Sequence, residues 1–290
     1  MTTRLILFIF WLMHFFPLPL LSISGRLLGF ALRIFAVERK NVVLKNLSAC
    51  FPDLPKKNLD ILLKKHFSSL GVALANTSIA WWGSPANLRE LAEIEGWENF
   101  VNADQNSPVI VLAPHFVGVE ILGIRISMEK DAVVIYSHQK SKIFDDFLRK
   151  KRERFSQPKL FSRQDSLKGV IRTLKAHVPL FLLPDMDFGP QDSIFVPFFG
   201  VSCATTTALP RIANLAKAVV VPVVIKKKTK SFGYKVSFLP AWKDFPSGNI
   251  QYDIKRINEF VEQQVKTSPE EYYWVHKRFK TRPDGEPPFY

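Results

Sequence analysis

From residue 108 to residue 266 the sequence alternates between short apolar runs and longer segments of helical character. The apolar runs favour β-strands and cover residues 108–113, 132–136, 180–183, 219–225 and 234–239. The helical segments cover residues 118–129, 141–154, 165–176, 205–217 and 252–266. This alternation predicts an α/β fold in which a mixed β-sheet is flanked by helices. A further helix is predicted from residue 55 onward, because apolar side chains there recur at spacings of three and four.

The first apolar run is followed at once by a histidine and, five residues later, a glutamate, within Pro114-His115-Phe116-Val117-Gly118-Val119-Glu120. In one continuous helix such residues would diverge by roughly 140°. We therefore expect His115 in the turn and Glu120 in the first turn of the next helix, where the two side chains can hydrogen-bond. An imidazole held by a carboxylate in one tautomer is a general base for a hydroxyl proton. The alternative is a structural turn histidine and a carboxylate favoured at a helix N-terminus by the macrodipole.

The N-terminus contains an uncharged apolar stretch from Leu5 to Ile23. Its length is close to the roughly 20 residues that cross a bilayer, so residues 1–24 are predicted to be a membrane anchor and residues 25–290 the remaining domain. Pro17 and Pro19 would interrupt a helix, which leaves open an interfacial or hairpin-like insertion instead of a span. Basic residues follow the stretch, and the positive-inside rule places the rest of the chain on the cytoplasmic side.

The chain is strongly basic, with 40 lysine and arginine residues against 26 acidic ones and a formal net charge of +14. This balance favours an anionic partner, which could be a membrane surface, a phosphorylated glycolipid, an acidic carrier protein or nucleic acid. The sequence has no helix-turn-helix, zinc-finger or RNP-like pattern, so nucleic acid is not expected. Cys50 and Cys203 lack metal-ligand spacing, and neither a metal nor another cofactor is expected.

Several sequence blocks resemble one family of enzymes. The H-x4-E pattern of His115 and Glu120 is similar to the H-x4-D/E signature of the glycerolipid acyltransferases and, more closely, of the late acyltransferases of lipid A biosynthesis. Three further blocks, at residues 39–54, 184–200 and 272–283, resemble that family's NL…CFP, PDxDxG…FVPFFG and YxWxHRRFKTRP elements. Lys277 stands where the family usually has an arginine.

The resemblance implies a glycerolipid-acyltransferase-like fold and an enzyme that moves a fatty acyl group from acyl carrier protein to a hydroxyl of a lipid A precursor. The expected location is the cytoplasmic face of a bacterial inner membrane. His115 would take the hydroxyl proton and Glu120 would orient the imidazole. The sequence has no G-x-S-x-G elbow, which argues against a covalent acyl-enzyme. A lysophospholipid or ornithine-lipid acyltransferase is the alternative enzyme, and a membrane adaptor without catalysis is the alternative from another class.

Three arginines are candidates for binding substrate. Arg152 lies where the resembled family has an important arginine, with Arg154 as the second choice and Arg163 as a further member of the group. A guanidinium fork can hold a phosphate by two contacts or support an acyl carbonyl as charge develops on it.

Two aspartates complete the expected site. Asp185 and Asp187 follow the apolar run 180–183, and the carboxyl ends of strands in open α/β sheets commonly face the site. We expect them to hold Arg152 or their own loop. The phenylalanines that follow are candidates for an acyl-chain pocket or, alternatively, for ordinary core: Phe195, Phe198 and Phe199.

Overall fold

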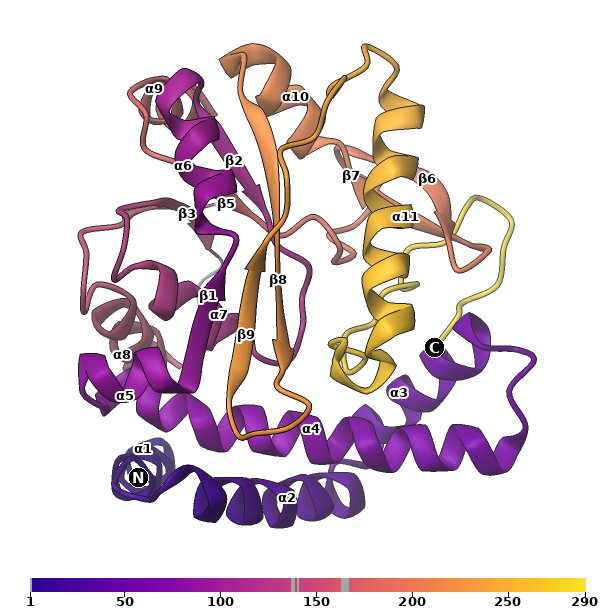
Figure 1. Ribbon diagram of the computed structural model, residues 1–290. Helices are drawn as coiled ribbons and strands as arrows, with labels where there is room; N and C mark the ends of the chain where they lie inside the picture. Colours follow the sequence, from indigo (N-terminus) through magenta and orange to yellow (C-terminus); the bar gives the residue numbers. More distant parts are fainter. Residues whose placement is uncertain (1, 137–138, 140, 163–166) are drawn as a thin grey trace.

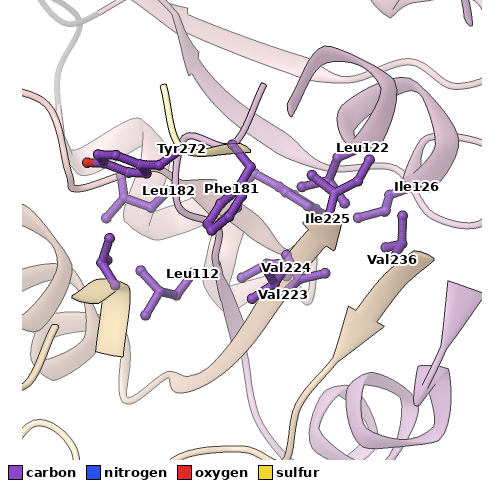
Figure 2. Packing of buried hydrophobic residues seen from close by; sticks show 14 of the residues in the cluster. Leu112, Leu122, Ile126, Phe181, Leu182, Val223, Val224, Ile225, Val236 and Tyr272 are labelled. Atoms are coloured by element: carbon purple, nitrogen blue, oxygen red, sulfur yellow. The ribbon is translucent and has the colours of Figure 1, made fainter. Parts of the chain in front are cut away.

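The computed structural model describes residues 2–136, 139, 141–162 and 167–290. At its centre is a seven-stranded sheet with the strand order β1-β9-β8-β2-β5-β3-β4 (Figure 1). The strands are β1 (Ala92–Glu95), β2 (Val109–Leu112), β3 (Val133–Tyr136), β4 (Lys159–Ser162), β5 (Leu180–Leu182), β8 (Val219–Lys227) and β9 (Tyr234–Phe238). All residues of β2 and β5 are buried (Figure 2), as expected for strands that are covered on both faces.

The strand pairing makes the sheet mixed, as the sequence predicted. β8, β2, β5, β3 and β4 run parallel, whereas β9 is antiparallel to β8 and parallel to β1. β2 and β5 pair directly, from Ile110 opposite Leu180 to Leu112 opposite Leu182. The segments that follow these two strands therefore start side by side, at the carboxyl-terminal ends of the parallel strands.

Helices flank this sheet, and a long helix crosses one end of it (Figure 1). The flanking helices are α5 (Pro85–Leu91), α6 (Trp97–Asn106), α7 (Val119–Ile126), α8 (Lys142–Arg152), α9 (Leu167–Lys175), α10 (Ala208–Ala216) and α11 (Ile250–Thr267). The long helix is α4 (Lys56–Trp82), which extends the helix predicted from residue 55. α3 (Val37–Cys50) lies at one end of α4 (Figure 1).

The five predicted strands and the helices between them are all present, but part of the fold was not predicted. β1, β4 and the hairpin of β6 (Ser193–Phe198) and β7 (Val201–Thr206) were missed. The hairpin turns at Phe199 and Gly200, with φ of 51° and 76°, as two-residue hairpin turns require. The helix predicted from residue 205 begins only at Ala208, because Thr205 pairs with Ile194 in the hairpin.

The N-terminal apolar stretch forms two helices and not one. α1 (Thr2–Met13) ends before Pro17, and α2 (Leu18–Phe35) begins after it. α2 is long and apolar enough to cross a membrane by length and composition. The predicted boundary after residue 24 falls inside α2, which continues to Phe35.

α2 packs closely along α4, because glycines let the two backbones touch (Figure 1). A Cβ atom added to Gly71 of α4 would lie 2.2 Å from the Gly25 carbonyl oxygen and 2.4 Å from the Gly29 nitrogen. Distances this short are not tolerated between a side chain and a rigid backbone. The second half of α2 is therefore an integral part of the folded domain.

We predict that Gly71→Ala lowers the free energy of unfolding by about 1–3 kcal/mol, because the added methyl group must push α2 away from α4. Gly123→Ala is the matched control, since nothing lies within 4 Å of a Cβ added there. In the interior of α7 this control should stabilise the protein by up to about 1 kcal/mol. Denaturant titration in detergent measures both changes. Equal stability of the two variants would contradict the close α2–α4 contact.

Candidate active site

The ends of the two paired strands bring a histidine and an aspartate together. His115 follows β2 and Asp185 follows β5, each directly after a proline that cannot donate to the sheet. His115 Nδ1 lies 2.6 Å from Asp185 Oδ1, and the backbone N–H of His115 donates to Asp185 Oδ2 at 2.8 Å. One carboxylate thus holds both the ring and the backbone of the histidine. The contact assigns the proton to Nδ1 and leaves Nε2 as the basic nitrogen.

Asp185 is suited to be a permanent anion beside this imidazole. Its burial by itself would raise the pKa of the carboxyl group, but the charge and hydrogen bonds of His115 and the charge of Arg278 keep that pKa below its usual value. The carboxylate therefore stays ionised at neutral pH. It can stabilise an imidazolium that forms when Nε2 accepts a proton.

Glu120 lies elsewhere, and the predicted hydrogen bond between His115 and Glu120 is wrong. Glu120 is the second residue of α7, and its carboxylate accepts from Arg152 Nη2 at 2.7 Å and Nε at 3.4 Å. Trp81 Nε1 also donates to it at 3.4 Å. Pairing of β2 with β5 places Asp185 on the ring of His115, and α7 turns Glu120 towards α8.

Arg152, the last residue of α8, is therefore held by Glu120 and not by either aspartate. Burial by itself would lower the pKa of the guanidinium group, but the Glu120 carboxylate raises that pKa above its usual value. Arg152 remains charged. Of the two expectations for the aspartates, contact with Arg152 is therefore not observed, and the substrate role of Arg152 stays a prediction.

Asp187 holds its own loop, which was one of the two roles expected for the aspartates. It accepts from the backbone N–H of Gly189 at 2.9 Å and from the Thr281 hydroxyl and backbone N–H at 2.7 and 2.6 Å. Its own N–H donates to His276 Nε2 at 2.9 Å. The loop after β5 is thus tied to the C-terminal segment of the chain.

The C-terminal segment also holds the loop after β2. The N–H of Tyr273 donates to the His115 carbonyl oxygen at 2.9 Å, and Phe116 forms an antiparallel bridge with Tyr272. A narrow crevice runs between the segment and the two loops, lined by Asn46, His115, Asp185, Met186, Tyr272, Tyr273, Trp274, His276 and Arg278. The aromatic and basic residues of this segment were noticed only as part of a family block and were given no role.

Among the residues that the structure describes, the other predicted substrate residues do not line this crevice. Arg154 donates to the carbonyl oxygens of Ala80, at 3.1 Å, and Gly83, and so caps the end of α4. Arg163 lies outside the residues that the structure describes. The three phenylalanines are part of the β6–β7 hairpin, where Phe198 is fully buried and the Phe199 ring packs at a tilt against Phe51, with 5.1 Å between ring centres. A role for Phe195, Phe198 and Phe199 in holding an acyl chain stays a prediction.

The fold and this geometry define a class of protein: an α/β enzyme with a histidine–aspartate pair at the carboxyl edge of its parallel strands. The chain matches the family described as "Bacterial lipid A biosynthesis acyltransferase" over residues 1–281. The chain belongs to this family and is an acyltransferase. Membership confirms the resemblance that its sequence blocks indicated and favours an enzyme over the adaptor alternative.

Individual relatives cover nearly the whole chain. The lipid A biosynthesis palmitoleoyltransferase of Escherichia coli (strain K12) is 30% identical over 284 residues, which are 97% of this chain and 92% of that protein. The lipid A biosynthesis lauroyltransferase of the same organism is 31% identical over the same shares. Among solved structures, the 1-acyl-sn-glycerophosphate acyltransferase of Thermotoga maritima aligns with a TM-score of 0.41 and 15% identity, covering 85% of this chain and 97% of that one.

We predict that His276 makes the protein less stable in acid. Burial, followed by the charges of His115 and Arg278, lowers the pKa of His276 from 6.5 to about 4. The unfolded chain therefore takes up this proton near pH 6.5 and the folded protein only near pH 4, so stability falls as the pH drops through this window. His276→Gln keeps an acceptor for the Asp187 N–H. It should reduce the acid-induced loss of unfolding free energy by up to about 3 kcal/mol.

The measurement is the free energy of unfolding between pH 7 and 4. His177→Gln, at an exposed histidine on the loop after α9, is the matched control. A His276→Gln protein with the same pH slope as the wild type would show that folding does not lower the pKa of His276.

Proposed function

We propose that this chain transfers a fatty acyl group from an acyl carrier protein thioester to a hydroxyl of a lipid A precursor, with His115 as the general base. The observation that carries the proposal is the His115–Asp185 pair, which leaves Nε2 of a nearly buried imidazole free to accept a proton. The relatives' names support the acceptor, because both are enzymes of lipid A biosynthesis.

In the proposed reaction, His115 Nε2 takes the proton of the acceptor hydroxyl while that oxygen attacks the thioester carbonyl carbon. The resulting tetrahedral intermediate then releases the carrier thiolate, which receives the proton from the imidazolium. One C–O bond forms, one C–S bond breaks, and the histidine returns to its starting state. Asp185 stabilises the imidazolium, the role first expected of Glu120, and no covalent acyl-enzyme is required.

Arg152 is the cation that we propose for contact with substrate. Its side chain is one-third exposed, and Glu120 holds one edge of the guanidinium. Arg152 does not line the crevice of the His115–Asp185 pair, so we propose that its remaining N–H groups hold a phosphate of the acceptor. Glu120 then acts by positioning Arg152 and not by orienting His115.

Charge and exposed apolar surface support the proposed donor and location. An acidic carrier protein suits a chain with a net charge of +14. Large apolar side chains are exposed along the first two helices, among them Phe8, Trp11, Phe16, Ile23, Leu27 and Phe35. A surface of this kind marks membrane contact. We place it in the cytoplasmic leaflet of a Gram-negative inner membrane.

The packing of α2 along α4 supports an insertion parallel to the membrane surface. If α2 crossed the bilayer, the Gly25, Gly29 and Gly71 contacts would have to be inside the membrane or be broken. An interfacial position leaves these contacts intact and puts the apolar face of α2 into the lipid. It also leaves α4 and the site above it next to the leaflet that contains the acceptor.

The test is an acyl-transfer assay in which the acyl group on the acyl carrier protein is radiolabelled. Three acceptors are offered separately: a lipid A precursor, a lysophospholipid and an ornithine lipid. We expect transfer to the lipid A precursor. His115→Ala should lose about two to four orders of magnitude of turnover, and Asp185→Asn should lose a comparable factor because an amide cannot stabilise an imidazolium. Thermal unfolding checks that each variant is folded.

His177→Ala is the matched control and should transfer at the wild-type rate, because this exposed histidine lies outside the crevice. Wild-type turnover in folded His115→Ala would rule out the general base. Transfer only to lysophospholipid or ornithine lipid would replace the proposed acceptor while leaving the mechanism in place.

We further predict that Arg152→Lys reduces turnover at least about tenfold, because an ammonium group keeps the charge but loses the planar fork. Glu120→Gln should reduce turnover as well, since it frees the Arg152 side chain. The control is Arg149→Lys, one turn earlier on the exposed face of α8. Full activity in Arg152→Lys would show that the guanidinium fork of Arg152 is not needed for contact with substrate.

A further inference from the structure

A second hollow lies away from the crevice, where the end of α2 and the start of α3 meet the first half of α4. Its volume is about 360 Å³. It is lined by Arg33, Ile34, Lys40, Asp60, Leu63 and Lys64. Three of these six side chains are cations and one is an anion. None of the roles proposed for the crevice uses them.

The cations of this hollow are not neutralised by the protein. Within the described part of the chain, no ion pair joins Arg33, Lys40 or Lys64 to any carboxylate, and Asp60 is likewise unpaired. The Glu38 carboxylate, two residues before Lys40 in α3, is already paired with Lys277 at 3.1 Å. The hollow therefore keeps a positive charge that an anionic ligand could neutralise.

An apolar surface begins at the edge of the same hollow. Ile34 lines it and is 46% exposed, and the adjacent Phe35 is 81% exposed. One turn earlier, Phe30 is 55% exposed and lies under the Arg33 guanidinium, 5.4 Å from its ring centre. A ligand that fits both surfaces has an anionic head and apolar chains.

We propose that this hollow binds the phosphate of an anionic lipid headgroup in the membrane. Arg33 offers a fork for two-point contact with phosphate oxygens, and Lys40 and Lys64 add point charges. The acyl chains of the lipid would run along the exposed apolar face of α2. The proposal rests on the membrane contact proposed above for α1 and α2, and it adds a specific site to that contact.

Such a site would fix the height of the active site above the membrane. Lys40 lines the hollow and Asn46 lines the crevice, and both are residues of α3. Six residues of helix span about 9 Å. A lipid held at the hollow would therefore keep the crevice at a constant short distance from the headgroup layer, where the acceptor must enter.

The experiment compares binding of the full-length protein to two kinds of vesicle, phosphatidylcholine alone and phosphatidylcholine with phosphatidylglycerol. The site variant combines Arg33→Gln, Lys40→Gln and Lys64→Gln. The control variant combines Arg172→Gln, Lys175→Gln and Lys243→Gln, which removes the same charge from exposed positions at the opposite end of the sheet (Figure 1). The two variants thus have the same net charge as each other, and both retain the apolar face of α2.

We expect the wild type to bind both vesicles and to prefer the anionic ones. The site variant should lose about tenfold or more of that preference, since a well-placed basic residue contributes about fivefold, whereas the control should lose less than about threefold. Asp60→Asn should increase the preference, because it removes a negative charge from the lining of the hollow. Unchanged binding of Asp60→Asn to phosphatidylcholine vesicles checks that its gain does not come from apolar surface exposed by misfolding.

Soluble glycerol 3-phosphate at constant ionic strength distinguishes a free phosphate from a lipid. If it abolishes the anionic preference of the wild type at a concentration no higher than that of the accessible phosphatidylglycerol, the hollow recognises phosphate without the acyl chains and the lipid assignment fails. Equal losses in the site and control variants would mean diffuse attraction and would overturn the site. A wild type that binds neither vesicle would instead contradict the proposed membrane contact. None of these readouts depends on acyl transfer.

Discussion

The site depends on the parallel pairing of β2 with β5. Each strand is short, apolar and buried, and each is followed two residues after its end by a proline and then a polar residue. Because the two strands are neighbours in register, their ends place His115 and Asp185 within hydrogen-bond distance. Residues 70 positions apart in the chain thus form one charged unit. The buried sheet holds this unit in place, as the proposed general-base role of His115 requires.

The C-terminal segment completes this arrangement from the other side. It hydrogen-bonds to the loop after β2 through Tyr273 and to the loop after β5 through His276 and Thr281. Both loops are therefore fixed by their strands and by a common third segment. The same segment contributes to the crevice, so the end of the chain both supports the histidine–aspartate pair and limits access to it.

Much of the fold could be predicted from the sequence, because the buried parallel strands are continuous apolar runs separated by helices. The elements that were missed have weaker local signals. β1 and β4 are short strands with polar residues, and the β6–β7 hairpin depends on positive φ at Phe199 and Gly200. Whether α2 joins the domain depends on glycine contacts with α4, which have no local signal at all.

The sequence by itself determined the α/β class and put a histidine and an aspartate, His115 and Asp185, directly after two apolar runs. It could not decide which side chains meet. Spacing along the chain favoured Glu120 as the partner of His115, yet strand order made Asp185 that partner and left Glu120 with Arg152. Sequence patterns report local geometry, and the order of strands in a sheet is set by packing between segments far apart in the chain.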